Sequence, residues 1–222
     1  MLEQLLPAGV AVAETRGEIT DAPLFPEEEE VVARAVEKRR REFSIGRACA
    51  RRALAELGVE QQAIPTGPRG APRWPAGIVG SITHCDGFRA GVAARQTEFA
   101  AIGIDAEVDA PLPAGLLADI ALPEERGRLE ALALQAPEVP WDRLLFSAKE
   151  SVYKAWFPLA ERWLGFEDAS VTIDPERRAF SARLLVPGPA PGGRALTGFT
   201  GSWLVRDGIV ATAIAVPASK GS

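Results

Sequence analysis

Two helical runs, each followed by short apolar strands, divide the 222-residue chain into two similar parts. In the first part a helical pattern covers 26–57. The strands that follow it are expected at 78–83, 88–94 and 99–107. In the second part helices are expected at 123–134 and 141–157, and strands at 168–174, 179–186 and 200–216. The repeated order favours an α+β fold of two halves, 1–110 and 111–222, with a cleft where they meet.

The first helix has clear ends. Pro26 followed by Glu27–Glu30 is a typical helix start, because proline suits the first turn and acidic side chains favour the positive end of the helix dipole. Gly58 is a natural stop. The run is long for one helix, so we expect a bend near Ser44–Gly46. After it, the Pro- and Gly-rich range 64–77 predicts a long loop, and such loops tend to be functional.

The residue counts exclude several kinds of site. With 25 Lys and Arg against 30 Asp and Glu the chain carries a formal charge of −5, which disfavours a globally basic nucleic-acid binder. His84 is the single histidine, so a two-histidine metal site is excluded and any Ser-His-Asp triad would have to use it. Cys49 and Cys85 are too few for a disulfide framework or a Cys-rich zinc site.

Nothing in the chain indicates export or insertion into a membrane. No apolar run reaches the roughly 18 residues of a transmembrane helix. The N-terminus lacks the basic start and long apolar run of a signal peptide. We therefore expect a cytoplasmic protein with both thiols reduced and no membrane partner.

The strand Ile102–Glu107 carries two carboxylates on one face. Side chains alternate along a strand, so Asp105 and Glu107 point the same way. Adjacent carboxylates repel each other unless a cation lies between them, and Mg²⁺ prefers one or two carboxylates together with phosphate oxygens and water. Taken alone, the pair is more simply explained as an exposed acidic strand end.

The helical segment Phe146–Ala155 places Glu150 and Lys154 on one face, because they are four residues apart. The simple interpretation is a surface ion pair worth about 0.3–0.5 kcal/mol. The functional interpretation is a carboxylate that completes a metal site or accepts a proton, beside a lysine that binds phosphate.

Two further segments carry phosphate-binding side chains. Thr83 and His84 end a strand at the turn before Gly87, where a hydroxyl, an imidazole and turn amides could contact phosphate; a turn with a surface histidine fits equally well. The range 38–52 holds seven cations. They could form a solvated helix face, bind phosphate, dock an acidic protein or contact DNA. Arg69, in the Pro- and Gly-rich loop, adds charge of the same sign.

Together these segments resemble the Sfp-type 4'-phosphopantetheinyl transferases, in particular the subgroup that includes enterobactin synthetase component D. The resemblance rests on Ile102–Glu107, on the Lys-Glu-x-x-x-Lys pattern ending at Lys154, and on Gly80–His84. Matching patterns at 39–47, 74–75 and 156–168 extend it over roughly residues 26–174. The Asp-x-Glu and Lys-Glu-x-x-x-Lys patterns are specific as a pair, though not singly.

The resemblance implies a pseudo-twofold α+β fold that binds coenzyme A between its halves. It implies transfer of the phosphopantetheine arm from coenzyme A, as substrate, to a serine of an apo carrier protein, with release of adenosine 3',5'-bisphosphate. By position, Asp105, Glu107 and the Ala106 carbonyl would hold Mg²⁺, or Mn²⁺ in its place. Glu150 would be a further metal ligand or the base for the serine. Lys154 would contact the pyrophosphate and protonate the leaving phosphate.

The resemblance also implies a set of coenzyme A contacts. By position, the residues that would bind the phosphates of coenzyme A are Arg39, Arg47, Arg69, Thr83 and His84. Relatives often carry Lys where this chain has Thr66. Thr66 stays among the expected contacts, and Arg69 is expected to compensate for the missing charge.

Three functions therefore compete. The leading one is a Mg²⁺-dependent transferase that acts as a monomer on acyl, polyketide or peptidyl carriers, in secondary metabolism such as siderophore or polyketide biosynthesis. The second is a module that binds coenzyme A or a carrier without turnover, and the acidic trio Asp105, Glu107 and Glu150 argues against it. The third is DNA binding through 38–52, which the negative net charge disfavours, so no nucleic-acid partner is expected.

Overall fold

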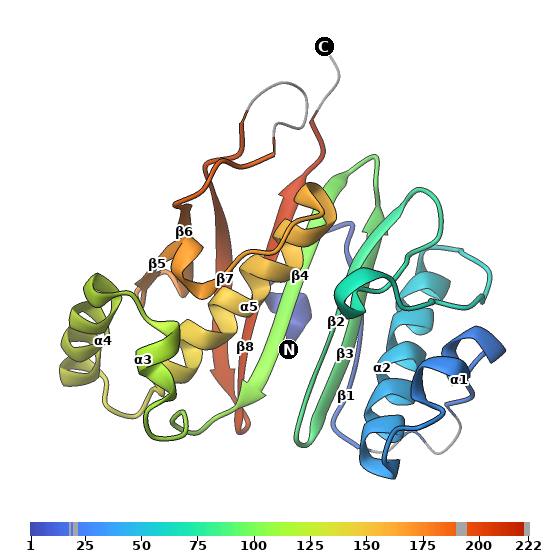
Figure 1. Ribbon diagram of the computed structural model, residues 1–222, viewed down its shortest axis with the longest axis horizontal. Coiled ribbons are helices and arrows are strands. Elements are labelled where there is room, and N and C mark those ends of the chain that lie inside the picture. The colour runs from blue at the N-terminus through green and yellow to red at the C-terminus, as the bar shows by residue number, and fades with distance from the viewer. Residues whose placement is uncertain (18, 20–21, 190–194, 220–222) are drawn as a thin grey trace.

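Two antiparallel sheets, each packed against one 20-residue helix, make up the protein (Figure 1). The computed structural model describes residues 1–17, 19, 22–189 and 195–219. The smaller sheet has the order β1-β3-β2, with β1 at Ala11–Thr15, β2 at Ile78–Cys85 and β3 at Phe88–Arg95. Helix α2, Glu37–Glu56, packs on this sheet. The α+β architecture expected from the sequence is confirmed.

The larger sheet has the order β4-β8-β7-β6-β5. Its strands are β4 (Phe99–Val108), β5 (Ala169–Asp174), β6 (Ala179–Leu184), β7 (Gly198–Arg206) and β8 (Ile209–Pro217). Helix α5, Trp141–Ala160, lies across β4 and β8. The shorter helices are α1 (Pro26–Val32), α3 (Leu116–Ile120) and α4 (Pro123–Gln135). Three-residue 3₁₀ turns occupy Leu2–Gln4, Pro68–Gly70 and Phe166–Asp168.

Most of the expected helices and strands are present within a few residues of their expected bounds. The prediction of a bend near Ser44–Gly46 is wrong, because α2 runs through these residues. The chain leaves the helix after Val32 and re-enters it at Glu37. The cause lies in tertiary contacts: the buried Glu28 carboxylate pairs with Arg51 at 2.8 Å, and this pairing folds α1 back against α2. The expected turn at 187–193 and the loose tail at 219–222 lie partly outside the described residues.

Strand β4 joins the two halves. Its hydrogen-bonded partner is β8, so it belongs to the larger sheet although it precedes residue 110. We therefore propose a division of the chain in the turn at 96–98, ahead of β4, in place of the expected one after residue 110. One cluster of buried apolar side chains spans both sheets and includes Val92 of β3, Ile104 of β4 and Ala211 of β8. The halves therefore share buried surface.

Helix α5 approaches β4 unusually closely. A side chain at Gly103 would collide with the Ser151 carbonyl and the Ala155 amide, so only glycine permits this contact. Hydroxyl groups of Ser147 and Ser151 on α5 bond Thr212 Oγ1 at 3.0 and 2.6 Å. Thr212 lies opposite Asp105 in the β4–β8 register. These contacts fix the part of α5 that carries Glu150 and Lys154 against the acidic strand.

No helix in the described ranges is both long enough and apolar enough to cross a membrane.

Candidate active site

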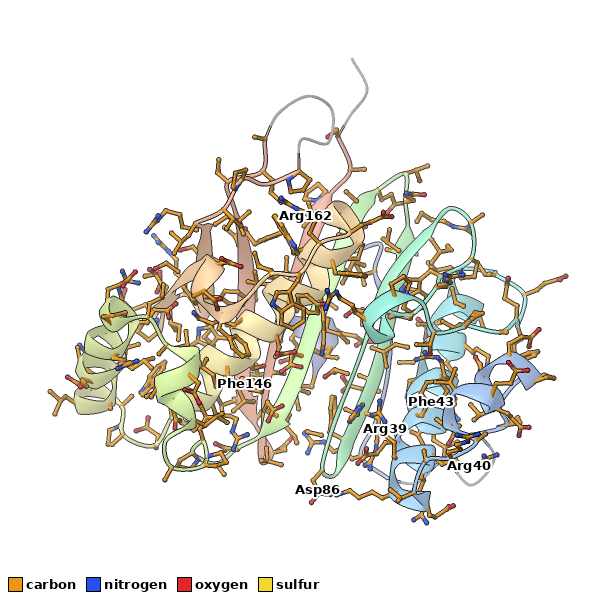
Figure 2. All side chains as sticks on the ribbon, viewed as in Figure 1. Arg39, Arg40, Phe43, Asp86, Phe146 and Arg162 are labelled. Atoms are coloured by element: carbon orange, nitrogen blue, oxygen red, sulfur yellow. The ribbon has the colours of Figure 1, made fainter. Side chains whose placement is uncertain are left out.

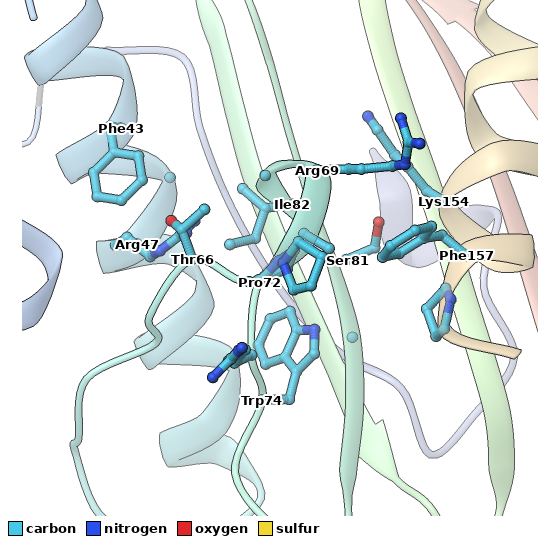
Figure 3. Close-up of a pocket in the computed structure, with 18 of the residues that line it drawn as sticks. Phe43, Arg47, Thr66, Arg69, Pro72, Trp74, Ser81, Ile82, Lys154 and Phe157 are labelled. Atoms are coloured by element: carbon cyan, nitrogen blue, oxygen red, sulfur yellow. The ribbon is translucent and has the colours of Figure 1, made fainter. Parts of the chain in front are cut away.

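A cavity of about 780 Å³ lies between the halves. Its N-terminal wall comes from α2, the loop at 64–77 and β2, and its C-terminal wall comes from α5. Figure 3 shows Phe43, Arg47 and Thr66 on one side and Lys154 and Phe157 on the other. The cleft expected where the halves meet is present, and it is large enough to hold a nucleotide-sized ligand.

The cavity brings together most of the expected site residues. Those that line it are Arg39, Arg47, Thr66, Arg69, His84, Glu150 and Lys154. Asp105, Ala106 and Glu107 are consecutive on β4, and Asp105 pairs with Lys154 of the cavity wall. Thr83 is placed differently: it is 2% exposed, and its hydroxyl faces β4.

Arg47 is a buried cation that organises the loop. Its Nε donates to the Ile64 carbonyl at 2.9 Å and its Nη2 donates to Thr66 Oγ1 at 3.1 Å. Its guanidinium lies 4.3 Å from the centre of the Phe43 ring. Burial lowers the pKa of Arg47 to about 10, so it is still positively charged at neutral pH. It therefore presents a fixed positive charge at the N-terminal wall.

His84 forms a second polar group on this wall, with Arg39. Arg39 Nη1 lies 3.0 Å from His84 Nε2. Because a guanidinium can only donate, Nε2 accepts and the ring proton belongs on Nδ1. Nδ1 lies 4.0 Å from the Glu42 carboxylate. Burial lowers the pKa of His84 below 6.5 and outweighs the opposing effect of Glu42, so the ring is neutral at pH 7.

The Asp105 carboxylate lies behind the C-terminal wall, where it pairs with Lys154. Its Oδ1 accepts from Lys154 Nζ at 2.7 Å and from the Thr83 hydroxyl at 3.3 Å. Its Oδ2 is buried and has no hydrogen-bond partner in the part of the chain that the structure describes. A buried carboxylate oxygen without a partner is costly, so this atom points to a missing ligand.

Glu107 and Glu150 are both electrostatically strained. Burial raises the pKa of each carboxyl above 4.5, and the nearby charge of Asp105 raises it further. Glu107 is partly compensated by Arg143, whose Nη1 donates to it at 2.9 Å. Arg143 also bonds the Ala110 carbonyl and so holds the chain that leaves β4. For Glu150 the compensating charge is Lys154.

These donors suit a divalent cation. The oxygen set, the partnerless Asp105 Oδ2 and the repulsion between the three acids fit the preference of Mg²⁺ for carboxylates with open positions for phosphate and water. Across the described ranges no three His, Cys, Asp or Glu side chains gather closely enough to form a complete metal cage. Asp105 is therefore the anchor, and Glu107 is held by Arg143.

Aromatic side chains form a second, smaller cavity of about 100 Å³ next to the first. Glu150 and Tyr153 line both cavities. Trp163 is 58% exposed, and the Arg69 guanidinium lies 5.3 Å from its ring centre, across the boundary between the halves. Tyr153 and Phe157 lie one helical turn apart on α5, and both line the larger cavity.

The basic segment at 38–52 does not form one continuous cationic face. Arg39 faces His84, whereas Arg40 points toward α1 and pairs with Glu29 (Figure 2). Arg41 pairs with Glu37 on α2. Arg51 is buried against Glu28. Docking of an acidic protein or of DNA along this helix would require exposed positive charges, but Arg40, Arg41 and Arg51 already pair with carboxylates of the protein.

Comparisons with known proteins agree with this geometry. The family model described as the 4'-phosphopantetheinyl transferase N-terminal domain matches residues 27–94, and that of the 4'-phosphopantetheinyl transferase superfamily matches 101–192. The chain is 53% identical over 228 residues to 4'-phosphopantetheinyl transferase Svp of Streptomyces mobaraensis, covering 100% of this chain and 92% of the relative. It is 50% identical over 223 residues to 4'-phosphopantetheinyl transferase Npt of Nocardia iowensis, covering 97% and 99%.

A more distant similarity extends over part of the chain. Enterobactin synthase component D of Salmonella typhi is 38% identical over 138 residues, which cover 61% of this chain and 55% of that protein. The two family models meet between residues 94 and 101, at the turn that precedes β4.

Proposed function

The chain belongs to the 4'-phosphopantetheinyl transferase superfamily, and we propose that it moves the 4'-phosphopantetheine arm of coenzyme A onto a serine of an apo carrier protein, releasing adenosine 3',5'-bisphosphate. The observation that carries the proposal is the opposed character of the cleft walls. One wall presents Arg39, Arg47 and His84, and the other presents Glu150 and Lys154 beside Asp105. Such a cleft suits a polyphosphate substrate that needs both cationic contacts and a divalent cation.

The N-terminal wall is the proposed site for the phosphates of coenzyme A. Arg39, Arg47 and His84 lie on this wall, and Arg69 reaches it from the loop. Thr66 contributes by holding Arg47, because its hydroxyl oxygen accepts a hydrogen bond from the Arg47 guanidinium. Arg69 supplies a positive charge from the loop, because Thr66 itself is neutral. Arginine is well suited here, since its planar fork matches phosphate oxygens.

The C-terminal wall carries the proposed chemistry. Displacement at a pyrophosphate phosphorus builds negative charge on the non-bridging oxygens and on the leaving phosphate. Lys154, held by Asp105 Oδ1 and the Ile104 carbonyl, is the proposed contact of the pyrophosphate and the proposed proton donor to the leaving group. No protein nucleophile is required, because the serine of the carrier attacks.

Glu150 is the proposed base for that serine, or a further metal ligand. Burial raises its pKa, which makes this carboxylate a better proton acceptor than an exposed one. Asp105, Glu107, Glu150 and the Ala106 carbonyl are the groups that would hold Mg²⁺ or Mn²⁺. The ion would neutralise charge on the phosphates.

The proposed partners are apo carrier domains of acyl, polyketide or peptidyl type. We propose that the protein acts as a monomer, since both cavity walls come from one chain. Cys49 and Cys85 are free thiols in the structure, which supports a cytoplasmic location.

The deciding experiment incubates the protein with coenzyme A, Mg²⁺ and a panel of apo carriers, and reads the carrier by intact mass. One arm per carrier is expected for the wild type, and none for Asp105→Ala. Glu130→Gln, an exposed change on α4, is the control and should transfer at the wild-type rate. Coenzyme A binding without any mass gain would instead identify a binding module, and full activity of Asp105→Ala would refute the metal assignment.

A further inference from the structure

Side-chain hydroxyls join the two sheets at the floor of the cleft. Strands β2 and β4 belong to different sheets but lie side by side. Ser81 Oγ on β2 accepts the Ile104 amide of β4 at 3.1 Å, and Thr83 Oγ1 accepts the Ala106 amide at 3.0 Å. Both hydroxyls are buried, with Ser81 4% and Thr83 2% exposed. The β4 amides that point toward β2 thus bond to side chains of the other half.

Thr83 makes one contact more than Ser81 does. Its oxygen already accepts the Ala106 amide, so its single proton is free to be donated. The acceptor in reach is Asp105 Oδ1, at 3.3 Å. Lys154 Nζ donates to the same oxygen at 2.7 Å. Two donors therefore hold Oδ1. Because they fix the orientation of the carboxylate, Oδ2 lies at a buried position where it has no hydrogen-bond partner among the described residues.

Strand alternation separates Thr83 from His84. Neighbouring residues of a strand face opposite sides, and here His84 lines the cavity; Thr83 shares a face with Ser81 but, unlike Ser81, does not line the cavity and bonds to β4. A phosphate contact through the Thr83 proton would require the hydroxyl to give up Asp105 Oδ1, and the buried Thr83 does not line the cavity. A hydrogen bond to a charged group is worth about 1.5–3 kcal/mol.

We propose that Thr83 is a positioning residue for the metal site and not a contact of coenzyme A. It orients the Asp105 carboxylate so that Oδ2 is presented to the divalent cation, and it ties that strand to the half that binds the phosphates. The proposal rests on the metal assignment in the proposed function. Groups that orient a metal ligand typically change metal affinity by about 10–100-fold when removed.

The test compares Thr83→Val, Thr83→Ser and Ser81→Ala. Valine keeps the shape of threonine but removes both hydrogen bonds, and serine restores the hydroxyl. Ser81→Ala is the matched control, because it breaks the same kind of bond to a β4 amide without touching Asp105. Thermal melting first establishes that each variant is folded. Binding of Mn²⁺ is then measured by electron paramagnetic resonance, with and without coenzyme A.

For Thr83→Val we expect Mn²⁺ to bind about tenfold more weakly or worse, with near wild-type affinity in Thr83→Ser and Ser81→Ala. At saturating Mn²⁺ the KM of Thr83→Val for coenzyme A should stay within about twofold of wild type, because the hydroxyl does not touch that substrate. Wild-type Mn²⁺ affinity in folded Thr83→Val would overturn the proposal. So would a change confined to the KM for coenzyme A, which would restore Thr83 as a phosphate contact.

The metal assignment itself has a separate signature in the same experiment. A wild-type protein that binds no Mn²⁺, with or without coenzyme A, and transfers the arm in the presence of a chelator would remove both the metal site and the role given to Thr83. If the wild type binds Mn²⁺ but folded Thr83→Val binds it equally tightly, the metal assignment stands and only the role proposed for Thr83 is excluded.

Discussion

The two walls of the cleft differ in how far their polar atoms are hydrogen-bonded within the protein. On the N-terminal wall, Arg47 bonds the Ile64 carbonyl and Thr66, and Arg39 donates to a neutral His84. On the C-terminal wall, two acids have raised pKa values and Asp105 Oδ2 has no partner. The first wall is assembled before any ligand binds. The second is strained, and a bound cation relieves it.

This difference predicts the largest effect for a neutral replacement on the strained wall. Glu150→Gln removes the proposed base and should lower the rate of arm transfer by about 10²–10⁴-fold. The protein should remain folded, because a buried charge that repels Asp105 has been removed. The rate is measured by intact mass of the carrier, and Glu130→Gln serves as control. An unchanged rate would exclude Glu150 from the mechanism.

Metal binding should stabilise the strained wall. At a Mg²⁺ concentration 100 times its dissociation constant, the free energy of unfolding should rise by about 2.7 kcal/mol. In Asp105→Asn the same Mg²⁺ should raise the melting temperature much less, because the anchoring carboxylate is gone. Calorimetric melting with and without chelator measures both. An equal gain in the two proteins would place the ion elsewhere.

When no divalent cation is present, the raised pKa of Glu150 should make the free energy of unfolding depend on pH. Glu150 titrates near 4.5 when unfolded and at a higher pKa when folded, because of burial and Asp105. Between these values the folded state binds more protons, so stability falls as the pH rises through the folded pKa. Urea unfolding of wild type and Glu150→Gln across this range isolates the effect. As the pH rises above 4.5, the wild type should lose stability relative to Glu150→Gln, and a gain in relative stability would contradict the sign.

The satisfied wall can be followed through its histidine, which gives a single imidazole signal in the NMR spectrum. Its pKa should lie below 6.5 in the free protein, because of burial. Glu42→Gln should lower it further, since the carboxylate of Glu42 raises it. Coenzyme A should raise it, because a phosphate dianion favours the protonated ring. A pKa that coenzyme A leaves unchanged would place the phosphates away from His84.

The smallest effect is expected where the two walls touch. Arg69 has a left-handed backbone, with φ of 56°, and its guanidinium stacks on Trp163. Losing a stack worth about 0.5–1 kcal/mol should raise the KM for coenzyme A roughly two- to fivefold. Trp163→Ala removes the stack and leaves the Arg69 charge in place, whereas Trp163→Phe keeps a weaker stack. If Trp163→Ala has the wild-type KM, the stack does not serve the substrate.

The elements and the paired acids could be predicted from the sequence because their signals are local. Alternation along 99–107 placed Asp105 and Glu107 on one face, and the four-residue spacing placed Glu150 beside Lys154. The break after Val32 could not be predicted, since it depends on the distant pairing of Glu28 with Arg51.

The roles of Arg143 and Thr83 were hidden for the same reason. Arg143 reads as one more helix cation until it is seen to hold Glu107. Thr83 sits next to a histidine in the sequence, and only strand pairing reveals that its hydroxyl turns to β4. A side chain that acts by orienting another, distant side chain has no recognisable pattern in the neighbouring sequence.

The core shared by β3, β4 and β8 limits how substrate can enter and leave. Moving the halves apart would expose that apolar surface and break the hydrogen bonds of Ser81 and Thr83 to β4. A wide opening of the cleft is therefore energetically unfavourable. Exchange of coenzyme A and its product would then use the rim of the cavity, where Arg69 of the loop at 64–77 lies against Trp163. Passage of substrate would then depend on this rim contact and not on a separation of the halves.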